Sequence, residues 1–182
     1  MGMPAQNIRW TAEMVRALPD DGNRYEVLDG QLFVSPAPSR LHQRAVRLLL
    51  MMLQEYCEKY SLGEALASPA DIEFSDEIEL QPDVFVVPDV RPTWRDAKAL
   101  TLAVEVISPS TARADRHDKK TIYRRERVPE YWIVDLDARL IERWQPDDSR
   151  PEILSDQLEW QPASAHPALT IDLPAYFRRV FT

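Results

Sequence analysis

Residues 102–135 run LAVEVISPSTARADRHDKKTIYRRERVPEYWIVD, in which two apolar segments flank a strongly charged one. The apolar segments, Leu102–Ile107 and Tyr131–Asp135, are rich in β-branched and aromatic residues, a composition typical of buried strands. The charged segment predicts a helix that begins at Ser110 or Thr111 and ends near Arg127, before a proline. A strand, a helix and a second strand in this order indicate a sheet covered by helices.

The region before this segment predicts a β-hairpin and a long helix. The strands Arg24–Leu28 and Gln31–Ser35 are separated by Asp29-Gly30, a pair that tolerates the positive φ angles of a tight hairpin turn. Ser39 can cap a helix over Arg40–Tyr60, where apolar residues recur at helical spacing, and Gly63 can close it. Other elements are predicted with less definition: helices at 12–18 and 174–181, and strands at 70–74, 83–87, 139–145, 152–154 and 158–161. We expect residues 1–182 to form one α/β or α+β domain with a mixed sheet.

The composition restricts the class of protein. The chain has 182 residues and one cysteine, Cys57. A single cysteine excludes an internal disulfide and a multi-thiolate zinc site, so a reducing cytoplasm is the expected compartment. The N-terminus shows no signal-peptide pattern, and no apolar run reaches the roughly 18 residues that a membrane helix requires. Export and membrane insertion are therefore not expected.

Charge is distributed unevenly along the chain. The formal net charge is −8, yet the segment Arg91–Arg127 has ten basic and five acidic residues, a net +5 that leaves −13 for the remainder. The overall negative charge argues against broad, sequence-independent wrapping of nucleic acid. The basic segment is either a solvated helix face, which is the more frequent case, or a local groove for a polyanion.

Three charged positions near the two central strands suggest a chemical site. Asp83 opens an apolar strand, Glu105 lies within the next one, and Lys119 or Lys120 follows on the helix. A glutamate in a strand that is apolar on both sides is costly to bury without a partner, so Glu105 indicates a site. Asp83 alone could be a turn residue after proline, and Lys119 alone a solvent-facing lysine.

The chemistry of this set fits phosphodiester hydrolysis. Two carboxylates on adjacent strands repel one another unless a cation compensates, and magnesium is a hard ion that takes carboxylate and water oxygens. A nearby ammonium can orient the attacking water or stabilise charge on the phosphate. Neither a serine-nucleophile motif nor a zinc motif surrounds the serines and histidines of the chain.

Three blocks of the sequence together resemble the Uma2 family of the PD-(D/E)XK nuclease superfamily. The blocks are RYEVLDGQLFVSPAPSRLHQ at 24–43, QPDVFVV at 81–87, and the segment 102–135. The resemblance implies a restriction-endonuclease-like fold, with a mixed sheet of four or five strands flanked by helices. It also implies that Asp83 and Glu105 are the ligands of a divalent metal, Mg²⁺ or Mn²⁺.

The resemblance departs from the superfamily pattern at the lysine. That lysine usually lies two residues after the second acid, where this chain has Ile107. Asp115, Lys119 and Tyr123 match a recurrent helix motif of the family and lie at i, i+4 and i+8, on one stripe of a helix. We therefore take Lys119 as the displaced lysine and Lys120 as its competitor.

Other positions need to be weighed beside these. Glu26 and His42 fall at family-matching places, as a further metal ligand and a residue facing the cleft, although a surface glutamate and a helix-terminal histidine explain them equally well. Asp89 also follows a proline, but it comes after the apolar VFVV run, so Asp83 is preferred. Tyr123 could stack on a base in basic surroundings, whereas the strand residues Tyr131 and Trp132 are better explained by core packing.

The sequence thus supports a leading hypothesis and two rivals. The first is a metal-dependent endonuclease that acts on DNA, with Asp83, Glu105 and Lys119 as its catalytic residues. The second is a catalytically inactive protein of the same fold that binds metal or nucleic acid, and the third is a structural or regulatory partner protein. A homodimer is suggested by analogy with nucleases that cut two strands.

Overall fold

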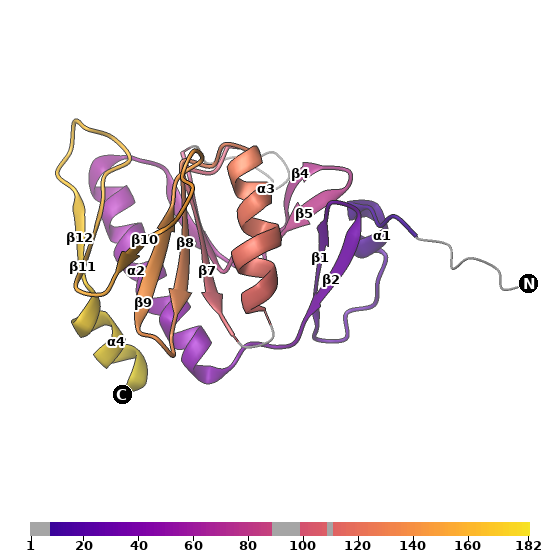
Figure 1. The fold of residues 1–182 in the computed structure, drawn as a ribbon, viewed down its shortest axis with the longest axis horizontal. Coiled ribbons are helices and arrows are strands. Elements are labelled where there is room, and N and C mark those ends of the chain that lie inside the picture. The colour runs from indigo at the N-terminus through magenta and orange to yellow at the C-terminus, as the bar shows by residue number, and fades with distance from the viewer. Residues whose placement is uncertain (1–7, 89–98, 109–110) are drawn as a thin grey trace, which may run out of the picture.

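The centre of the protein is a six-stranded mixed sheet (Figure 1). This computed structural model describes residues 8–88, 99–108 and 111–182. Strands β7 and β8 run parallel, and the other neighbouring strands of this sheet are antiparallel. In spatial order the strands are β10 (Glu152–Leu154), β9 (Leu140–Trp144), β8 (Glu130–Asp135), β7 (Leu102–Ile107), β6 (Val84–Val87) and β3 (Glu64–Ala67).

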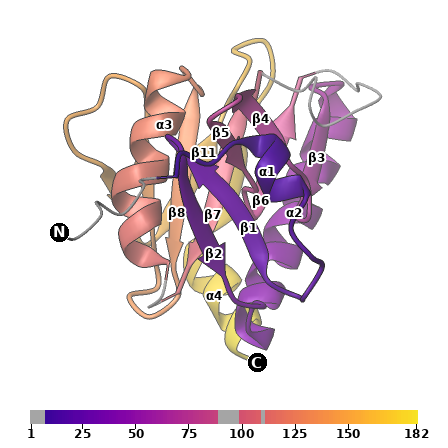
Figure 2. The same cartoon turned by 90° about the vertical axis from the view of Figure 1, so that its right-hand side faces the viewer.

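Both faces of the central strands are covered, which accounts for their nearly continuous apolar sequence. Every residue of β6 and β7 is buried. The even-numbered residues of both strands pack with α2 (Arg40–Tyr60) and α4 (Leu173–Phe181), and their odd-numbered apolar residues pack with α3 (Lys120–Arg125) and a second sheet. Figure 2 shows α2 and α3 on opposite sides of these strands. Because side chains alternate along a strand, Glu105 belongs to the face that α3 and the second sheet cover.

The second sheet contains the N-terminal hairpin. Its order is β2-β1-β5-β4, and the hairpin strands pair from Arg24 opposite Ser35 to Leu28 opposite Gln31. Asp29 and Gly30 have φ angles of 50° and 77°, as the predicted turn requires. The hairpin prediction is therefore confirmed. The strands are β1 (Arg24–Leu28), β2 (Gln31–Ser35), β4 (Ile72–Ser75) and β5 (Ile78–Leu80), and α1 (Ala12–Arg16) precedes them.

The long helix α2 has the predicted bounds. The side chain of Ser39 accepts a hydrogen bond from the backbone N–H of His42, which satisfies one of the free donors at the helix start. The helix ends in a left-handed residue, Ser61, two positions before Gly63. Gly63 has φ 108°, and a Cβ there would lie 1.9 Å from the carbonyl oxygen of Val87. Only glycine allows the chain to pass so close to β6 before it enters β3.

The helix predicted between the central strands is not a uniform α-helix. Residues Ala114–Lys119 form a π-helix that continues into α3, and the backbone N–H of Lys120 bonds to the carbonyl of Asp115, five residues earlier. The predicted helix is thus present, and part of it is π-helical. The π-helical turn is wider, and such turns occur frequently at functional sites.

The sequence missed several short strands. The main sheet has six strands rather than four or five, because β3 was not predicted, and β5 was also missed. A separate ribbon pairs β11 (Gln157–Trp160) with β12 (Leu169–Asp172), a segment expected to be a loop. Asp172 caps α4, which begins one residue before the predicted range of 174–181. Asp89 and the first part of the basic segment lie outside the described residues. None of the described helices has the length and apolar character that a membrane span requires.

Candidate active site

The pairing of β6 with β7 places Asp83 beside Glu105. Val84 pairs with Val104 in antiparallel register. Asp83, which directly precedes β6, therefore lies opposite Glu105 of β7. The backbone N–H of Val106 donates a 2.8 Å hydrogen bond to Oδ2 of Asp83. Both carboxylates are almost fully buried, with 3% of Asp83 and 1% of Glu105 exposed. The expected approach of two carboxylates on adjacent strands is therefore present.

Two side chains from outside the central sheet hold the Asp83 carboxylate. Nη1 of Arg24, on β1, lies 2.8 Å from Oδ1, and Nε2 of His42, on α2, lies 2.9 Å from Oδ2. Burial opposes ionisation of this carboxyl, but the hydrogen bond and charge of His42 and the charge of Arg24 outweigh it and lower the pKa of Asp83 to about 2. Asp83 is consequently an anion at neutral pH.

Glu105 has different partners. Oε1 of Glu105 accepts hydrogen bonds from Nζ of Lys119 at 3.0 Å and from the hydroxyl of Tyr123 at 3.3 Å. Burial raises the pKa of Glu105 well above its ordinary value, and the neighbouring carboxylates add to this effect, although the charge of Lys119 opposes it. The two acids therefore ionise very differently, as the environments of paired catalytic carboxylates often dictate.

Lys119 lies at the centre of three carboxylates. Its Nζ is 2.9 Å from Oε1 of Glu26 and 3.6 Å from Oδ1 of Asp115, in addition to its contact with Glu105. Only 1% of the lysine is exposed. Burial alone would lower the pKa of Lys119, but the three acidic groups raise it above its ordinary value. The ammonium is therefore retained at neutral pH.

Glu26 and Asp115 are the two acids that contact Lys119 in addition to Glu105. Glu26 lies on β1 and is fully buried, and its Oε1 also accepts the backbone N–H of Gln81 at 2.8 Å. Asp115 lies in the π-helix one turn before Lys119, and burial raises the pKa of its carboxyl. Oε2 of Glu26 and Oδ1 of Asp115 are buried without a hydrogen-bond partner among the described residues. Both oxygens are enclosed by protein, and Oδ1 of Asp115 lies 3.6 Å from the Lys119 ammonium, so charge rather than hydrogen bonding compensates its burial.

Arg24 was not predicted from the sequence as a site residue. It lies two positions before Glu26 on β1, so alternation directs both side chains to the same face. This spacing was the available signal. Burial opposes its charge, yet Asp83, Glu105 and Glu26 together raise the pKa of Arg24, which remains a cation.

The geometry separates the two competing lysines. Lys119 is buried against Glu105, whereas Nζ of Lys120 lies 4.5 Å from the ring centre of Trp144, away from the carboxylates. Tyr123, Tyr131 and Trp132 are each buried to 1% exposure or less, so none of them offers a surface on which a base could stack. The stacking interpretation of Tyr123 is thereby wrong.

The described part of the basic segment does not form a free cationic groove. Arg116 bonds to Asp135 and Glu142. Arg125 pairs with Asp29, and Arg127 pairs with Asp147. These three arginines are thus neutralised by acidic partners, while Lys120 contacts the Trp144 ring and Arg124 donates to the carbonyl of Pro146.

A cavity of about 300 Å³ opens beside the two central acids. Asp83, Glu105 and Asp115 line it, together with Arg24 and His42. Among the described residues no three His, Cys, Asp or Glu side chains are already arranged around a common metal position. Magnesium does not require such a group, since it commonly binds one or two carboxylates and completes its shell with water and phosphate oxygens. The hard oxygen donors here therefore fit a divalent cation chemically.

Comparisons with known proteins agree with this fold. A family model, Uma2, described as "putative restriction endonuclease", matches residues 12–174. A crystal structure described as a "putative nuclease belonging to DUF820" from Anabaena variabilis ATCC 29413 superposes with a TM-score of 0.77. It shares 14% sequence identity, and the match covers 93% of this chain and 98% of that one. No curated protein sequence matches significantly. The predicted fold class and family resemblance are confirmed.

Proposed function

Because the chain belongs to the Uma2 family, we propose that it is a divalent-metal-dependent endonuclease that hydrolyses phosphodiester bonds in DNA. Magnesium or manganese would be its cofactor. The supporting observation is that Asp83 and Glu105 line one cavity while Nζ of Lys119 lies 3.0 Å from Glu105. A reducing cytoplasm remains the expected compartment, because the single thiol, Cys57, is buried and unpaired.

Asp83 and Glu105 would hold the metal. Asp83 is ionised over the whole neutral range, as a metal ligand must be. A bound divalent cation supplies Lewis-acid polarisation of the phosphoryl oxygen and lowers the pKa of a water molecule. It also favours the ionised form of Glu105, which burial otherwise opposes.

Lys119 would act as a donor rather than as a base. Its three acidic neighbours raise its pKa, so the ammonium keeps its proton and cannot remove one from water. Its three N–H groups face Glu26, Glu105 and Asp115, so it would act by holding Glu105 and by its positive charge, which stabilises negative charge that grows on the phosphate. Glu26 and Asp115 would position the ammonium, and Tyr123 would fix the Glu105 carboxylate through its hydroxyl.

Arg24 and His42 would have a second role beside Asp83. Both contact the carboxylate directly and both line the cavity. Arg24 is the cation closest to Asp83 and would bind the phosphate next to the one that is cut. A homodimer would allow two such sites to cut two strands, and this arrangement is proposed by analogy alone.

A cleavage assay tests the proposal. Purified protein is incubated with plasmid, linear and branched DNA in the presence of Mg²⁺ or Mn²⁺, beside Glu105→Gln and the surface control Glu152→Gln. We expect Glu105→Gln to lower the cleavage rate by roughly 100-fold or more, while Glu152→Gln cleaves like the unchanged protein. Thermal melting of each variant checks that it is folded. Equal cleavage by all three proteins, or none by any of them, would contradict the proposal.

One observation favours a second function, an inactive protein that binds metal or nucleic acid. Both oxygens of Asp83 already have protein partners, and Lys119 already neutralises the carboxylates around it. Calorimetric titration with Mn²⁺ distinguishes the two functions. Metal binding that Asp83→Ala abolishes, without cleavage of any DNA, would establish the second function in place of the first.

A further inference from the structure

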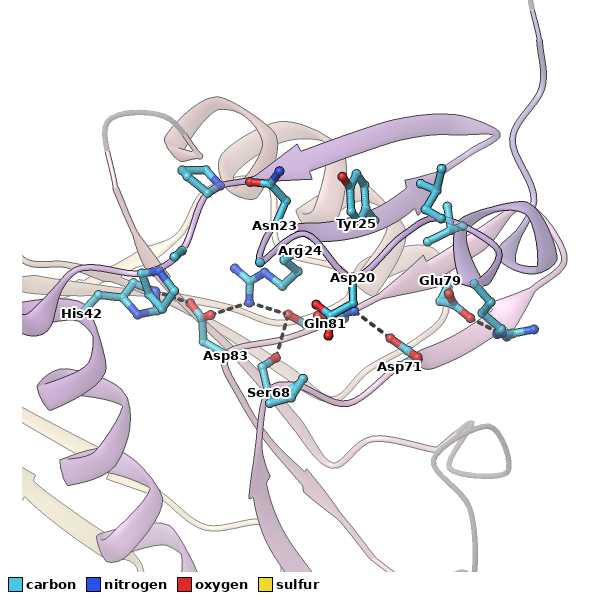
Figure 3. A pocket seen from close by; sticks show the side chains of 18 of the residues that line it. Asp20, Asn23, Arg24, Tyr25, His42, Ser68, Asp71, Glu79, Gln81 and Asp83 are labelled. Atoms are coloured by element: carbon cyan, nitrogen blue, oxygen red, sulfur yellow. Dashed lines mark hydrogen bonds and ion pairs between the residues drawn. The ribbon is translucent and has the colours of Figure 1, made fainter.

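A second cavity, larger than the one beside Glu105, lies on the other side of Asp83. Its volume is about 590 Å³, which is within the roughly 300–1,000 Å³ of small-molecule sites. Figure 3 shows the cavity with His42, Arg24 and Asp83 at one end and Asp71 and Glu79 toward the other. These first three residues line both cavities. A ligand in the larger cavity would therefore touch the candidate site directly.

The charge of the larger cavity excludes an anionic ligand from most of it. Four acidic residues line it, and only two arginines oppose them: Asp20, Asp71, Glu79, Asp83, Arg16 and Arg24. Arg16 is already paired with Glu73 and Glu79. A phosphate group is thus attracted only at the Arg24 end, and the remaining space suits a neutral or electron-poor group.

Arg24 has unused donors at that end. Its Nη1 donates both to Asp83 and to the carbonyl of Gln81, at 2.8 and 3.1 Å. Its Nε and Nη2 have no hydrogen-bond acceptor among the described residues, although the side chain is partly exposed. A guanidinium with two free N–H groups is well suited to a phosphate oxygen.

The far part of the cavity offers acceptors. Nε2 of Gln81 donates a 2.7 Å hydrogen bond to Oδ1 of Asp71, which fixes the two side chains together. Oε1 of Gln81 and Oδ2 of Asp71 then remain without partners within the described part of the chain, and both residues are partly exposed. The lining of the cavity also includes apolar surfaces, among them Pro19, Tyr25 and Pro36. A flat ring with hydrogen-bond donors on its edge matches such a lining.

From these contacts we infer that the larger cavity binds one unpaired nucleobase that carries an exocyclic amino group, with the adjoining phosphate on Arg24. The base would be adenine, cytosine or guanine, whose amino groups can donate to Asp71 and Gln81. Thymine has no exocyclic amino group, and its one ring N–H donor lies between two carbonyl oxygens that the acidic residues would repel. This inference rests on the proposed function, because it takes the ligand to be the nucleic acid that is cut.

The base must leave its duplex to enter. A base that is stacked and paired cannot reach the interior of a cavity, so it is rotated out of the helix or belongs to a single strand. Unstacking costs least at a mismatch, a bulge or a single-stranded region. The preferred DNA substrate would therefore carry an unpaired nucleotide next to the bond that is cut.

Binding without cleavage tests the inference separately from the proposed activity. Fluorescence anisotropy in EDTA is measured with fully paired DNA and with duplexes of the same sequence that carry one bulged cytosine, thymine or abasic nucleotide. We expect the bulged cytosine to bind roughly tenfold more tightly than the bulged thymine or the abasic site. Equal affinity for all four duplexes would overturn the inference.

Two variants examine the polar pair, and a third serves as a matched control. Asp71→Asn replaces an acceptor by an amide that can donate, and Gln81→Met removes the neighbouring carbonyl. Each should reduce the preference for cytosine over thymine to about twofold or less. Asp147→Asn makes the same chemical change on an exposed loop and should leave the preference intact. An unchanged preference in both Asp71→Asn and Gln81→Met would contradict the assignment of these residues.

The outcomes of the two tests are distinguishable. Metal-dependent cleavage that ignores the unpaired base and Asp71 would preserve the proposed function and overturn the cavity assignment. A cytosine preference in EDTA that depends on Asp71, without cleavage of any DNA, would preserve the cavity and overturn the nuclease. Neither binding nor cleavage would overturn both.

Discussion

At the scale of single residues, the most unusual group is the ammonium of Lys119. It lies inside the protein within 3.6 Å of three carboxylates, and those carboxylates come from β1, β7 and the π-helix. Burying an ion is expensive, and only close partners compensate for the lost hydration. The lysine therefore joins the two sheets and the helix electrostatically, in addition to any role in chemistry.

Replacing Lys119 by methionine should reveal this cost. The variant leaves buried carboxylates without their cation, so the free energy of unfolding should fall by about 3–5 kcal/mol near pH 8. Urea denaturation followed by circular dichroism measures the loss. Lys59→Met, which removes an exposed lysine from the same chain, should change stability by less than about 0.5 kcal/mol.

The same variant should depend on pH in a defined direction. Burial already raises the pKa values of Glu105 and Asp115 in the folded protein, and loss of the ammonium would raise them further. A carboxyl with a raised folded pKa costs stability increasingly as the pH rises above its unfolded value, which is about 4. Lys119→Met should therefore be less destabilising at pH 5 than at pH 8. An identical loss of unfolding free energy at both pH values would show that the destabilisation does not come from the ionised carboxylates.

Individual site residues were predictable to different degrees. A charged residue in an apolar strand pointed to Glu105, because a buried charge needs a partner. Asp83 could have been a turn residue by itself, and mainly the family resemblance selected it. Arg24 was not found, since its role depends on how the hairpin docks against β7. Two partners of Lys119, Glu105 and Asp115, were named beside it from the sequence. Glu26 was named only as a further metal ligand, because its contact with Lys119, 93 residues away along the chain, depends on the tertiary fold.

At the scale of elements, the sequence predicted a helix or strand correctly where a capping residue or a turn motif marked its end. The hairpin turn at Asp29-Gly30, the Ser39 cap and the Asp172 cap each satisfy backbone geometry within a few residues. Strands β3, β5 and β12 have three or four residues each, and they pair with β6, with β1 and β4, and with β11. Such short segments contain too little periodicity to be distinguished from loops.

Gly63, between α2 and β3, should tolerate no side chain. Gly63→Ala places a Cβ against the carbonyl of Val87 in a backbone conformation with φ 108°, so β3 would have to move away from β6. We expect a loss of about 3 kcal/mol or more, or a protein that does not fold. Thermal denaturation measures it.

Gly22→Ala is the matched control for this prediction. Gly22 also has a positive φ, 84°, but nothing lies within 4 Å of the position that a Cβ would take there. Its cost should be limited to about 1 kcal/mol of backbone strain. Similar losses for both variants would show that the contact with β6 is unimportant.

At the scale of the whole molecule, the net charge is negative, and several arginines among the described residues are bound to acidic partners. The chain carries −8 overall, and Arg116, Arg125 and Arg127 are occupied by acidic partners. Such a surface cannot gain much affinity by releasing counterions from a long stretch of DNA. Recognition would depend instead on a few local contacts, with Arg24 as the central cation.

Salt dependence of binding measures the number of these contacts. With about two phosphates neutralised, raising the salt from about 50 to about 200 mM should weaken DNA binding roughly tenfold, whereas six to ten contacts would cost about 10³–10⁵. Arg24→Gln should lower the slope by about one unit, and the remote Arg127→Gln should leave it unchanged. A steep slope that Arg24→Gln does not alter would place the main phosphate contacts elsewhere.

Arg24, His42 and Asp83 line both cavities, so binding in one cavity can affect binding in the other. A ligand that draws Asp83 toward one cavity weakens its bond to Arg24, and a ligand that engages Arg24 in the other cavity releases Asp83. Occupancy on one side would then change affinity on the other, and such coupling is reciprocal by necessity. If the chain binds metal and nucleotide as proposed, nucleotide in the larger cavity would then alter its affinity for the metal.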